Sequence, residues 1–355
     1  MSCVGPNAER RLSVTWVAAG WETRKTGPSS TGGCPIEAFS LLRTADQVLF
    51  NDLIDYAGLF PPASLSMEDA VAEYRSARGG VHSPLLGRFI SPASRLEELA
   101  GILTATMVAG EAPWPISSIL DGDIAHAAVA TNNFDAEMEP AAQVALLEVS
   151  LPAAAGDGRS VDEVTNLVAP IVTAALAASV AAMPFFELKA PNQQQDGIEN
   201  AVAAVAALRG TVWRPLGVKL RCGGPAASAF PEPRHVAAFI AASAAAGLPF
   251  KATAGLHHAI RHYDADPGVM RHGFLNLLAA AALASTGSPA ARLVAVIEET
   301  DPAAFGVTVS GLRWRGTRVA IADLVRAREQ FAAYGSCSFT EPVADLVSLG
   351  MVTVS

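Results

Sequence analysis

The sequence has 355 residues and a formal net charge of −9; 51% of the residues are hydrophobic and 17% are charged. An acidic chain lacks the basic surface that non-specific nucleic-acid binding needs, and this apolar fraction is too large for a disordered protein. No uninterrupted apolar segment reaches the roughly eighteen residues of a membrane-spanning helix, so neither nucleic acid nor a membrane is expected as a partner.

Residues 1–44 differ from the rest of the chain in composition. They are rich in Gly, Ser, Thr and Pro and show no sustained hydrophobic period. They also lack the basic segment and the apolar segment of a secretory signal. We expect a poorly ordered, flexible extension over residues 1–44 and a single catalytic domain over residues 45–355.

From Val48 onward, short apolar segments that end in polar residues alternate with alanine-rich helical segments. The apolar segments recur at intervals of about thirty residues, as consecutive β-α-β units require. Seven strands are predicted, at Leu53–Asp55, Leu85–Ile90, Ile116–Leu120, Val144–Val149, Phe185–Lys189, Gly217–Arg221 and Pro249–Thr253.

Helices are predicted in the gaps between these strands. The first begins at the N-cap residue Ser66 and ends at Gly79. Others are predicted over Asp162–Ala178, Ile198–Leu208, Pro231–Gly247 and Phe274–Ala284. One helix in each gap is the crossover that neighbouring parallel strands require.

An insertion separates the seventh predicted strand from the eighth. It should hold a helix over Ala291–Glu299, a hairpin over Val307–Trp314 and a helix over Val319–Gln330, before strand eight at Phe331–Phe339 and a last helix at Pro342–Leu349. This order predicts an α/β fold, a (βα)8 TIM barrel with an insertion between strands seven and eight. A doubly wound open sheet is the competing fold, but the even spacing and the lack of an early GxGxxG turn favour the barrel.

Charged residues interrupt strands that should be apolar, because a parallel sheet covered by helices is buried on both faces. Three neighbouring strands carry polar pairs two residues apart, on one side of each strand: Glu187 and Lys189, Lys219 and Arg221, and Lys251 and Thr253. Earlier strands carry Asp55, Arg88 and Glu148. Burying unpaired charges costs several kcal/mol per ion, and barrel active sites lie at the C-terminal strand ends. The pattern therefore predicts an active site there; a structural ion-pair network is the alternative.

The predicted catalytic residues are Lys251, Lys219, Glu187, Lys189 and Glu148. Like charges and burial disfavour an ammonium group, so one lysine could be neutral near pH 7. A neutral lysine attacks a carbonyl carbon and forms a Schiff base, while a glutamate moves protons. Simple binding of an anionic substrate by the lysines is the alternative.

Two segments resemble the class I aldolases typified by deoxyribose-phosphate aldolase. Lys251-Ala252-Thr253-Ala254-Gly255 is similar to that family's Schiff-base strand, Lys-Thr-Ser-Thr-Gly. Val218-Lys219-Leu220-Arg221-Cys222-Gly223-Gly224 is similar to its other lysine strand, Lys-Pro-Ala-Gly-Gly, with one extra residue before the glycines. The two motifs come in reversed chain order. The resemblance covers about a dozen residues and implies an aldolase-like site in which either lysine is the covalent one.

Further residues are predicted to bind substrate. Gly223 and Gly224 can expose backbone N–H groups to a phosphate or carboxylate, or can form an ordinary tight turn. Arg88 and Arg221 are candidate anion clamps. The full predicted set is Asp55, Arg88, Arg221, Gly223, Gly224, Thr253, His257, His258, Ser336 and Ser338.

Four of the seven histidines lie within sixteen residues, at His257, His258, His262 and His272. They could act as acids, bases or anion ligands, or bond to the backbone. No cofactor is expected; the alternative is a divalent metal ion bound by His257, His258 and His272, or by two histidines with Glu148 or Glu187. Cys337 could be a nucleophile, although its default is a small buried hydrophobe.

The cysteines Cys3, Cys34, Cys222 and Cys337 are far apart and form no CxxC motif, which favours a reducing cytoplasm over a disulfide framework. The leading interpretation is an enzyme, an aldolase-like carbon–carbon lyase or related carbonyl-processing enzyme acting through lysine on a small anionic substrate. A metal-dependent isomerase or hydrolase using His257 and His258 is one alternative, and a non-catalytic ligand-binding barrel is another. The alanine-rich surface is compatible with a homo-oligomer.

Overall fold

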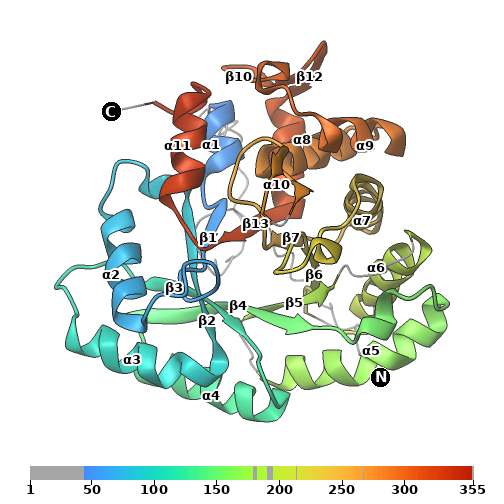
Figure 1. The fold of residues 1–355 in the computed structure, drawn as a ribbon. Coiled ribbons are helices and arrows are strands. Elements are labelled where there is room, and N and C mark those ends of the chain that lie inside the picture. The colour runs from blue at the N-terminus through green and yellow to red at the C-terminus, as the bar shows by residue number, and fades with distance from the viewer. Residues whose placement is uncertain (1–43, 179–181, 190–194, 213, 267, 354–355) are drawn as a thin grey trace, which may run out of the picture.

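Eight parallel strands close into a barrel in the order β1-β13-β7-β6-β5-β4-β3-β2 (Figure 1). The structure is a computed structural model that describes residues 44–178, 182–189, 195–212, 214–266 and 268–353. The extension predicted over residues 1–44 thus lies outside the described residues except for Thr44. The predicted (βα)8 barrel is confirmed, and the open-sheet alternative is wrong.

The barrel strands match the predicted segments closely. They are β1 (Ile54–Tyr56), β2 (Leu86–Pro92), β3 (Trp114–Ile119), β4 (Ala142–Ser150), β5 (Met183–Leu188), β6 (Gly217–Arg221), β7 (Phe250–Thr253) and β13 (Phe331–Ser336). Three ends differ from the prediction. The strand β2 continues to Pro92, β5 ends before Lys189, and β13 ends at Ser336 instead of Phe339.

Helices surround the barrel as an outer ring (Figure 1). They are α2 (Met67–Arg78), α3 (Leu96–Ala105), α4 (Ile124–Met138), α5 (Val161–Ala178), α6 (Gln195–Arg209), α7 (Pro233–Ala246), α8 (Phe274–Ser285), α10 (Ile321–Gln330) and α11 (Thr340–Ser348), with α1 (Ala45–Phe50) before β1 and α9 (Ala290–Glu298) inside the insertion. The Ser66 side chain caps α2 by accepting the Asp69 N–H, as its sequence predicts. None of the helices described is long and apolar enough to cross a membrane.

The main apolar core lies between the barrel and its helices. A second, smaller apolar cluster consists of Leu146, Met183 and Phe185. Leu146 shares a strand face with Glu148, and Phe185 shares one with Glu187, because side chains two residues apart point the same way. The face of β4 and β5 that carries this small cluster therefore also carries the charged side chains.

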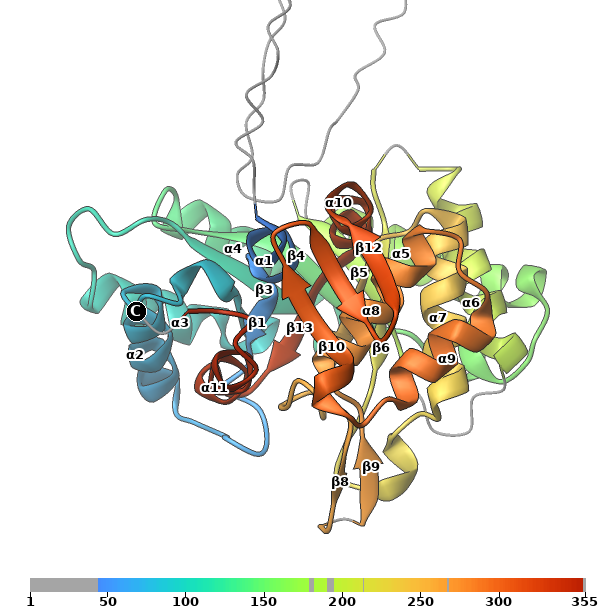
Figure 2. The same cartoon turned by 90° about the horizontal axis from the view of Figure 1, so that it is seen from above.

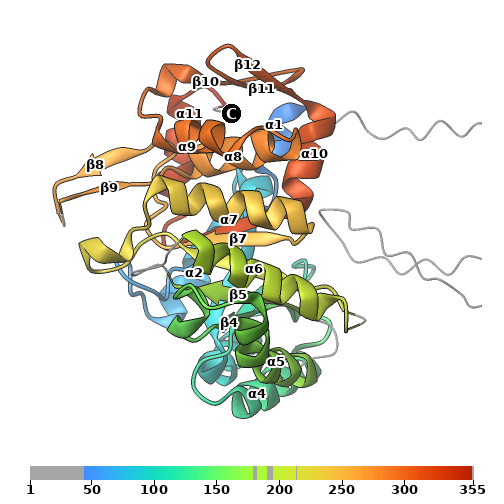
Figure 3. The same ribbon diagram turned by 90° about the vertical axis from the view of Figure 1, so that its right-hand side faces the viewer.

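The insertion between β7 and β13 is larger than predicted. It begins with an unpredicted hairpin of β8 (His262–Asp264) and β9 (Val269–Arg271), which projects from the body of the molecule (Figures 2 and 3). The predicted two-stranded hairpin is a three-stranded antiparallel sheet, β10 (Phe305–Thr308), β11 (Gly311–Trp314) and β12 (Thr317–Ala320). Because Val319 and Ala320 pair with β11, the following helix starts at Ile321.

Candidate functional site

Glu148 bridges two buried lysines inside the barrel. Its Oε1 lies 2.6 Å from Lys251 Nζ, and its Oε2 contacts Lys219 Nζ. Each lysine also has a second carboxylate. Lys219 Nζ lies 2.7 Å from Glu187 Oε2, and Lys251 Nζ lies 2.6 Å from Asp55 Oδ2. We call these five side chains the buried charge cluster.

Strand register brings the buried charge cluster together. Glu187 pairs with Lys219 across β5 and β6, and Lys219 pairs with Lys251 across β6 and β7. Side chains at paired positions of adjacent strands point to the same face, so all three face the interior that Glu148 enters from β4. This geometry confirms that Lys219, Lys251, Glu148, Glu187 and Asp55 meet, as their positions in the sequence predict.

The cluster is almost closed to solvent. Side-chain exposure is 0% for Lys251, 1% for Glu148 and 3% for Lys219. Ser117 donates a hydrogen bond of 2.8 Å to Glu148 Oε1, and the Phe185 ring centroid lies 5.9 Å from Lys251 Nζ. A buried charge is stable only when it is paired and hydrogen-bonded, and this shell provides both.

Electrostatics in the cluster favour full ionisation. Burial alone would raise the pKa of Glu148, but the Lys219 and Lys251 ammonium groups outweigh it and hold that pKa well below its usual range. Burial alone would lower the pKa of Lys219, but Glu148 and Glu187 outweigh it and raise that pKa above its ordinary value. The expectation that neighbouring lysines would make one of them neutral is therefore wrong for Lys219, because carboxylates separate them.

The two arginines of the predicted site lie at different places. Arg221 ends β6, and its guanidinium lies 3.5 Å from Glu187 Oε1 with 40% of the side chain exposed. Arg88 is the third residue of the seven-residue β2, so it lies in the first half of its strand and not at the C-terminal end where the active site was predicted. Its guanidinium lies 3.3 Å from Asp55 Oδ1, so Arg88 belongs with the charge cluster.

Lys189 does not join the buried charge cluster. It follows the last residue of β5, and its side chain is exposed. The i, i+2 alternation that would align it with Glu187 holds only inside a strand, and β5 ends first. The predicted group of three lysines is thus a pair.

The glycines and Thr253 are explained by close packing near the ends of β6 and β7. A Cβ at Gly223 would lie 2.9 Å from the Phe230 ring, and a Cβ at Gly224 would lie 2.8 Å from Ala229 Cβ. Thr253 pairs with Arg221 and Gly335 on the two neighbouring strands. Their suggested part in substrate binding stays a prediction.

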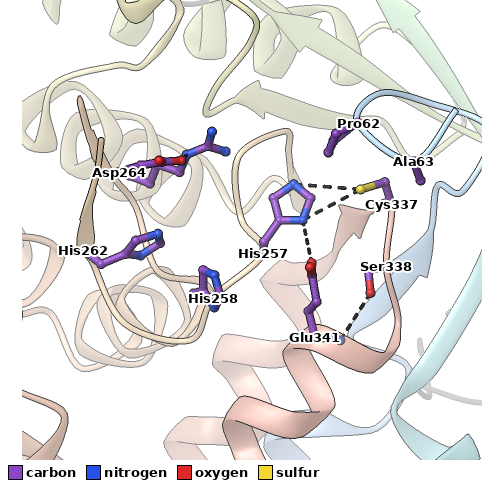
Figure 4. A pocket seen from close by; sticks show the side chains of 10 residues that line it. Pro62, Ala63, His257, His258, His262, Asp264, Cys337, Ser338 and Glu341 are labelled. Carbon is purple, nitrogen blue, oxygen red and sulfur yellow. Dashed lines mark hydrogen bonds and ion pairs between the residues drawn. The ribbon is translucent and has the colours of Figure 1, made fainter. Parts of the chain in front are cut away.

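A separate pocket of about 380 Å3 lies beside the ends of β1, β7 and β13 (Figure 4). None of the buried charge cluster lines it; its residues are Pro62, Ala63, His257, His258, His262, Asp264, Arg271, Cys337, Ser338 and Glu341. Three of these, His257, His258 and Ser338, were predicted to bind substrate. The structure therefore divides the one predicted site into two.

Cys337, His257 and Glu341 are in contact within this pocket (Figure 4). Cys337 Sγ lies 3.8 Å from His257 Nδ1 and 3.9 Å from Nε2, and Nδ1 lies 3.1 Å from Glu341 Oε2. Burial, and then the charge of Glu341, raise the pKa of the Cys337 thiol against the opposing effect of the Ala63 backbone N–H. The sulfur is therefore a thiol at neutral pH.

Neighbouring polar groups of the pocket are held by local bonds. His258 Nδ1 lies 3.2 Å from Asp345 Oδ2, and the same carboxylate oxygen accepts the Ala259 N–H. Ser336 Oγ donates to the Ser338 carbonyl oxygen, and Ser338 Oγ accepts the Glu341 N–H. The two serine hydroxyls thus fix the loop that leads into α11.

His272 is separate from the other predicted metal ligands. It is fully buried, its Nε2 lies 2.7 Å from the Pro231 carbonyl oxygen, and its Nδ1 lies 3.0 Å from an Arg261 nitrogen. Both ring nitrogens are thus committed, so the predicted set of His257, His258 and His272 does not form. Across the part of the chain that the structure describes, no three His, Cys, Asp or Glu residues are arranged to hold a metal ion.

Sequence reasoning missed Glu341, His262, Asp264 and Arg271 as pocket residues. Glu341 lies in the first turn of α11, where an acidic residue ordinarily indicates only a favourable helix dipole. Asp264 and Arg271 form a 2.5 Å ion pair across the unpredicted β8–β9 hairpin. The alternating residues of β8 and β9 are few, and no turn motif flagged them.

Comparison with known proteins gives few matches. No protein-family model matches this chain, and no curated protein sequence matches it either. One solved structure, described as "QR15, an Aldolase", is 10% identical and aligns with a TM-score of 0.41 over 59% of this chain and 83% of its own. The chain thus has a weak overall resemblance to one aldolase.

Proposed function

We propose that the chain is a barrel enzyme that processes a small carbonyl compound through a Schiff base, as an aldolase-like carbon–carbon lyase. The observation that carries the proposal is the pair of interior lysines held on the two oxygens of Glu148. An amine that attacks a carbonyl needs an adjacent proton acceptor, and both lysines already touch one.

Lys219 is the proposed covalent residue. It shares Glu187 with the partly exposed Arg221 at the strand end, so a substrate entering from the C-terminal mouth reaches it first. Lys251 is enclosed by Asp55, Glu148 and Ser117 and has no exposed surface. Its fixed positive charge holds Glu148 in place between the two amines.

The chemistry assigns a separate task to each group. Lys219 passes a proton to Glu148 or Glu187, and its amine then adds to the substrate carbonyl carbon; loss of water gives the imine. The protonated imine accepts the electron pair of the adjacent carbon–carbon bond, which breaks and releases a second carbonyl compound. Proton return and hydrolysis free the lysine.

An anionic substrate fits the charge of this region. The cluster and its arginines contain four cations, Lys219, Lys251, Arg88 and Arg221, against the three carboxylates Asp55, Glu148 and Glu187. The half-open Arg221 guanidinium is the cation nearest to solvent. A phosphate or carboxylate on the substrate would bind it with paired hydrogen bonds.

Borohydride trapping tests the proposal. The protein is incubated with short aldehydes and ketones that bear phosphate or carboxylate, reduced, and mapped by peptide mass spectrometry. We expect a reduced adduct on Lys219 that is absent from Lys219→Met. Lys189→Met is the matched control, because it removes an exposed lysine next to the same mouth and should leave the adduct intact.

A non-catalytic barrel is the rival outcome, since Lys251 is completely paired. If no adduct forms on Lys219 across the panel, or if Lys189 reacts equally well, the Schiff-base function is refuted. The lysines would then be counter-ions of a structural network. In that case Lys219→Met would lower stability without removing any trapped product.

A further inference from the structure

The pocket beside the barrel mouth contains a thiol, an imidazole and a carboxylate in a chain of contacts. Cys337 comes from the end of β13, His257 from the segment after β7, and Glu341 from the first turn of α11. Figure 4 shows the His257 ring between the sulfur and the carboxylate. None of these groups belongs to the buried charge cluster.

One tautomer of His257 satisfies both neighbours. Nδ1 lies 3.1 Å from Glu341 Oε2, and a carboxylate only accepts, so Nδ1 carries the proton. Nε2 then has a lone pair, and it lies 3.9 Å from Cys337 Sγ. The imidazole is therefore set to accept a proton from the thiol while Glu341 fixes its orientation, which is the arrangement of an activated nucleophile.

We infer that Cys337 is a second nucleophile of this protein, which takes acyl groups from a small ester or thioester. Its sulfur forms a bond to the acyl carbon, the bond from that carbon to the leaving oxygen or sulfur breaks, and the thiol proton passes through His257 Nε2 to the leaving group. Water then hydrolyses the thioester on Cys337 and returns a proton to the sulfur. Glu341 is a positioning residue, since it touches only the imidazole.

The surroundings of the sulfur suit acyl chemistry. The backbone N–H groups of Ala63 and of Cys337 itself are directed at Sγ, next to the place where an acyl oxygen would gain charge. The pocket volume of about 380 Å3 lies at the small end of ligand sites. A protonated thiol needs a base, and His257 is the base in contact.

Cys222 provides a control within the same chain. It is completely buried, its sulfur lies near the Leu220 carbonyl oxygen, and burial raises its pKa to about 12. Cys222 does not line the pocket. Exposure differs little between the two sulfurs, at 0% and 8% by residue, so a large difference in reactivity would come from the environment of Cys337.

Acylation by p-nitrophenyl acetate tests the inference on the unaltered protein first. We expect a burst of p-nitrophenolate and an acetyl group on Cys337, formed about a hundred times faster than on Cys222. Equal rates at the two cysteines, or acetylation elsewhere only, would overturn the inference. This comparison needs no variant and does not depend on how a variant folds.

Variants then separate the contributions. Cys337→Ala should abolish the burst, and His257→Gln should slow it about a hundredfold or more. Glu341→Gln should slow it about tenfold and change its pH profile, whereas Glu341→Asp should restore both. Lys219→Met should leave the burst unchanged, because the proposed lysine site is separate. A burst that survives His257→Gln at the original rate would exclude the base.

Discussion

Glu148 sets the electrostatic balance of the barrel interior because each of its oxygens contacts a different lysine. Ser117 gives the same carboxylate a hydrogen bond, so its acceptor capacity is largely used. Removing one member of a buried network leaves its partners charged and unpaired. A single substitution here should therefore cost more than the loss of one hydrogen bond.

We expect Glu148→Gln to lower the free energy of unfolding by about 3–5 kcal/mol, measured by urea denaturation. Glu98→Gln is the matched control. It breaks the Arg95–Glu98 pair on the surface of α3, where a pair contributes about 0–1 kcal/mol. Similar losses in the two variants would mean that the interior charges are solvated and not held by Glu148.

Helix packing around the barrel depends on glycines in very different settings. Gly197, near the start of α6, lies against the backbone before α5, where a Cβ would come within 2.2 Å of the Gly156 carbonyl oxygen. Gly101 lies inside α3 with nothing within 4 Å of an added Cβ. The same substitution should therefore have opposite effects at the two positions.

Gly197→Ala should destabilise the protein by about 1–3 kcal/mol, because α6 must move away from rigid backbone. Gly101→Ala should stabilise it by about 0.5–1 kcal/mol, because alanine restricts the unfolded chain and favours the helix. Thermal unfolding of both variants at one pH measures the two signs. Loss of stability in Gly101→Ala would show that α3 has a neighbour at that point.

Elements with a clear period were predictable, and elements defined by pairing were not. The barrel strands followed from apolar segments at even intervals. The β8–β9 hairpin has three residues in each strand and exposed or half-exposed side chains, so no hydrophobic pattern marks it. The end of β5 before Lys189 depends on where its neighbours stop pairing, which a single segment does not encode.

The site was predictable to the same extent. Residues inside strands, such as Lys219, Lys251 and Glu148, were brought together because strand register follows from the fold. Cys337, His257 and Glu341 come from loops and a helix end, whose directions depend on tertiary packing. The pocket that they line was therefore invisible as a unit, although two of its histidines stood out by number.

The stability of the whole molecule should fall in mild acid because of His272. Burial, together with the nearby Arg261 guanidinium, lowers its pKa to about 4, although the bond to Pro231 opposes this. The unfolded chain protonates a histidine near pH 6.5, so between about pH 6.5 and about pH 4 the unfolded state binds the extra proton. Stability from this residue is complete above that window and is lost as the pH falls through it.

The loss attributable to His272 should total roughly 3 kcal/mol across the window. Measured free energies of unfolding should show a shallower slope with pH in His272→Gln, whatever its stability at neutral pH. His126→Gln, which removes an exposed imidazole on α4, is the matched control. An unchanged slope in His272→Gln would contradict the assignment.

The ion pair between Asp55 and Lys251 also has a consequence for biosynthesis. It joins the first and seventh strands of the barrel, and β13 must insert between β1 and β7 to close the ring. As the chain leaves the ribosome, Asp55 emerges long before the lysine that neutralises it. The early half-barrel therefore carries unmatched negative charge that resists premature collapse, and the late arrival of Lys251 should couple charge neutralisation to ring closure.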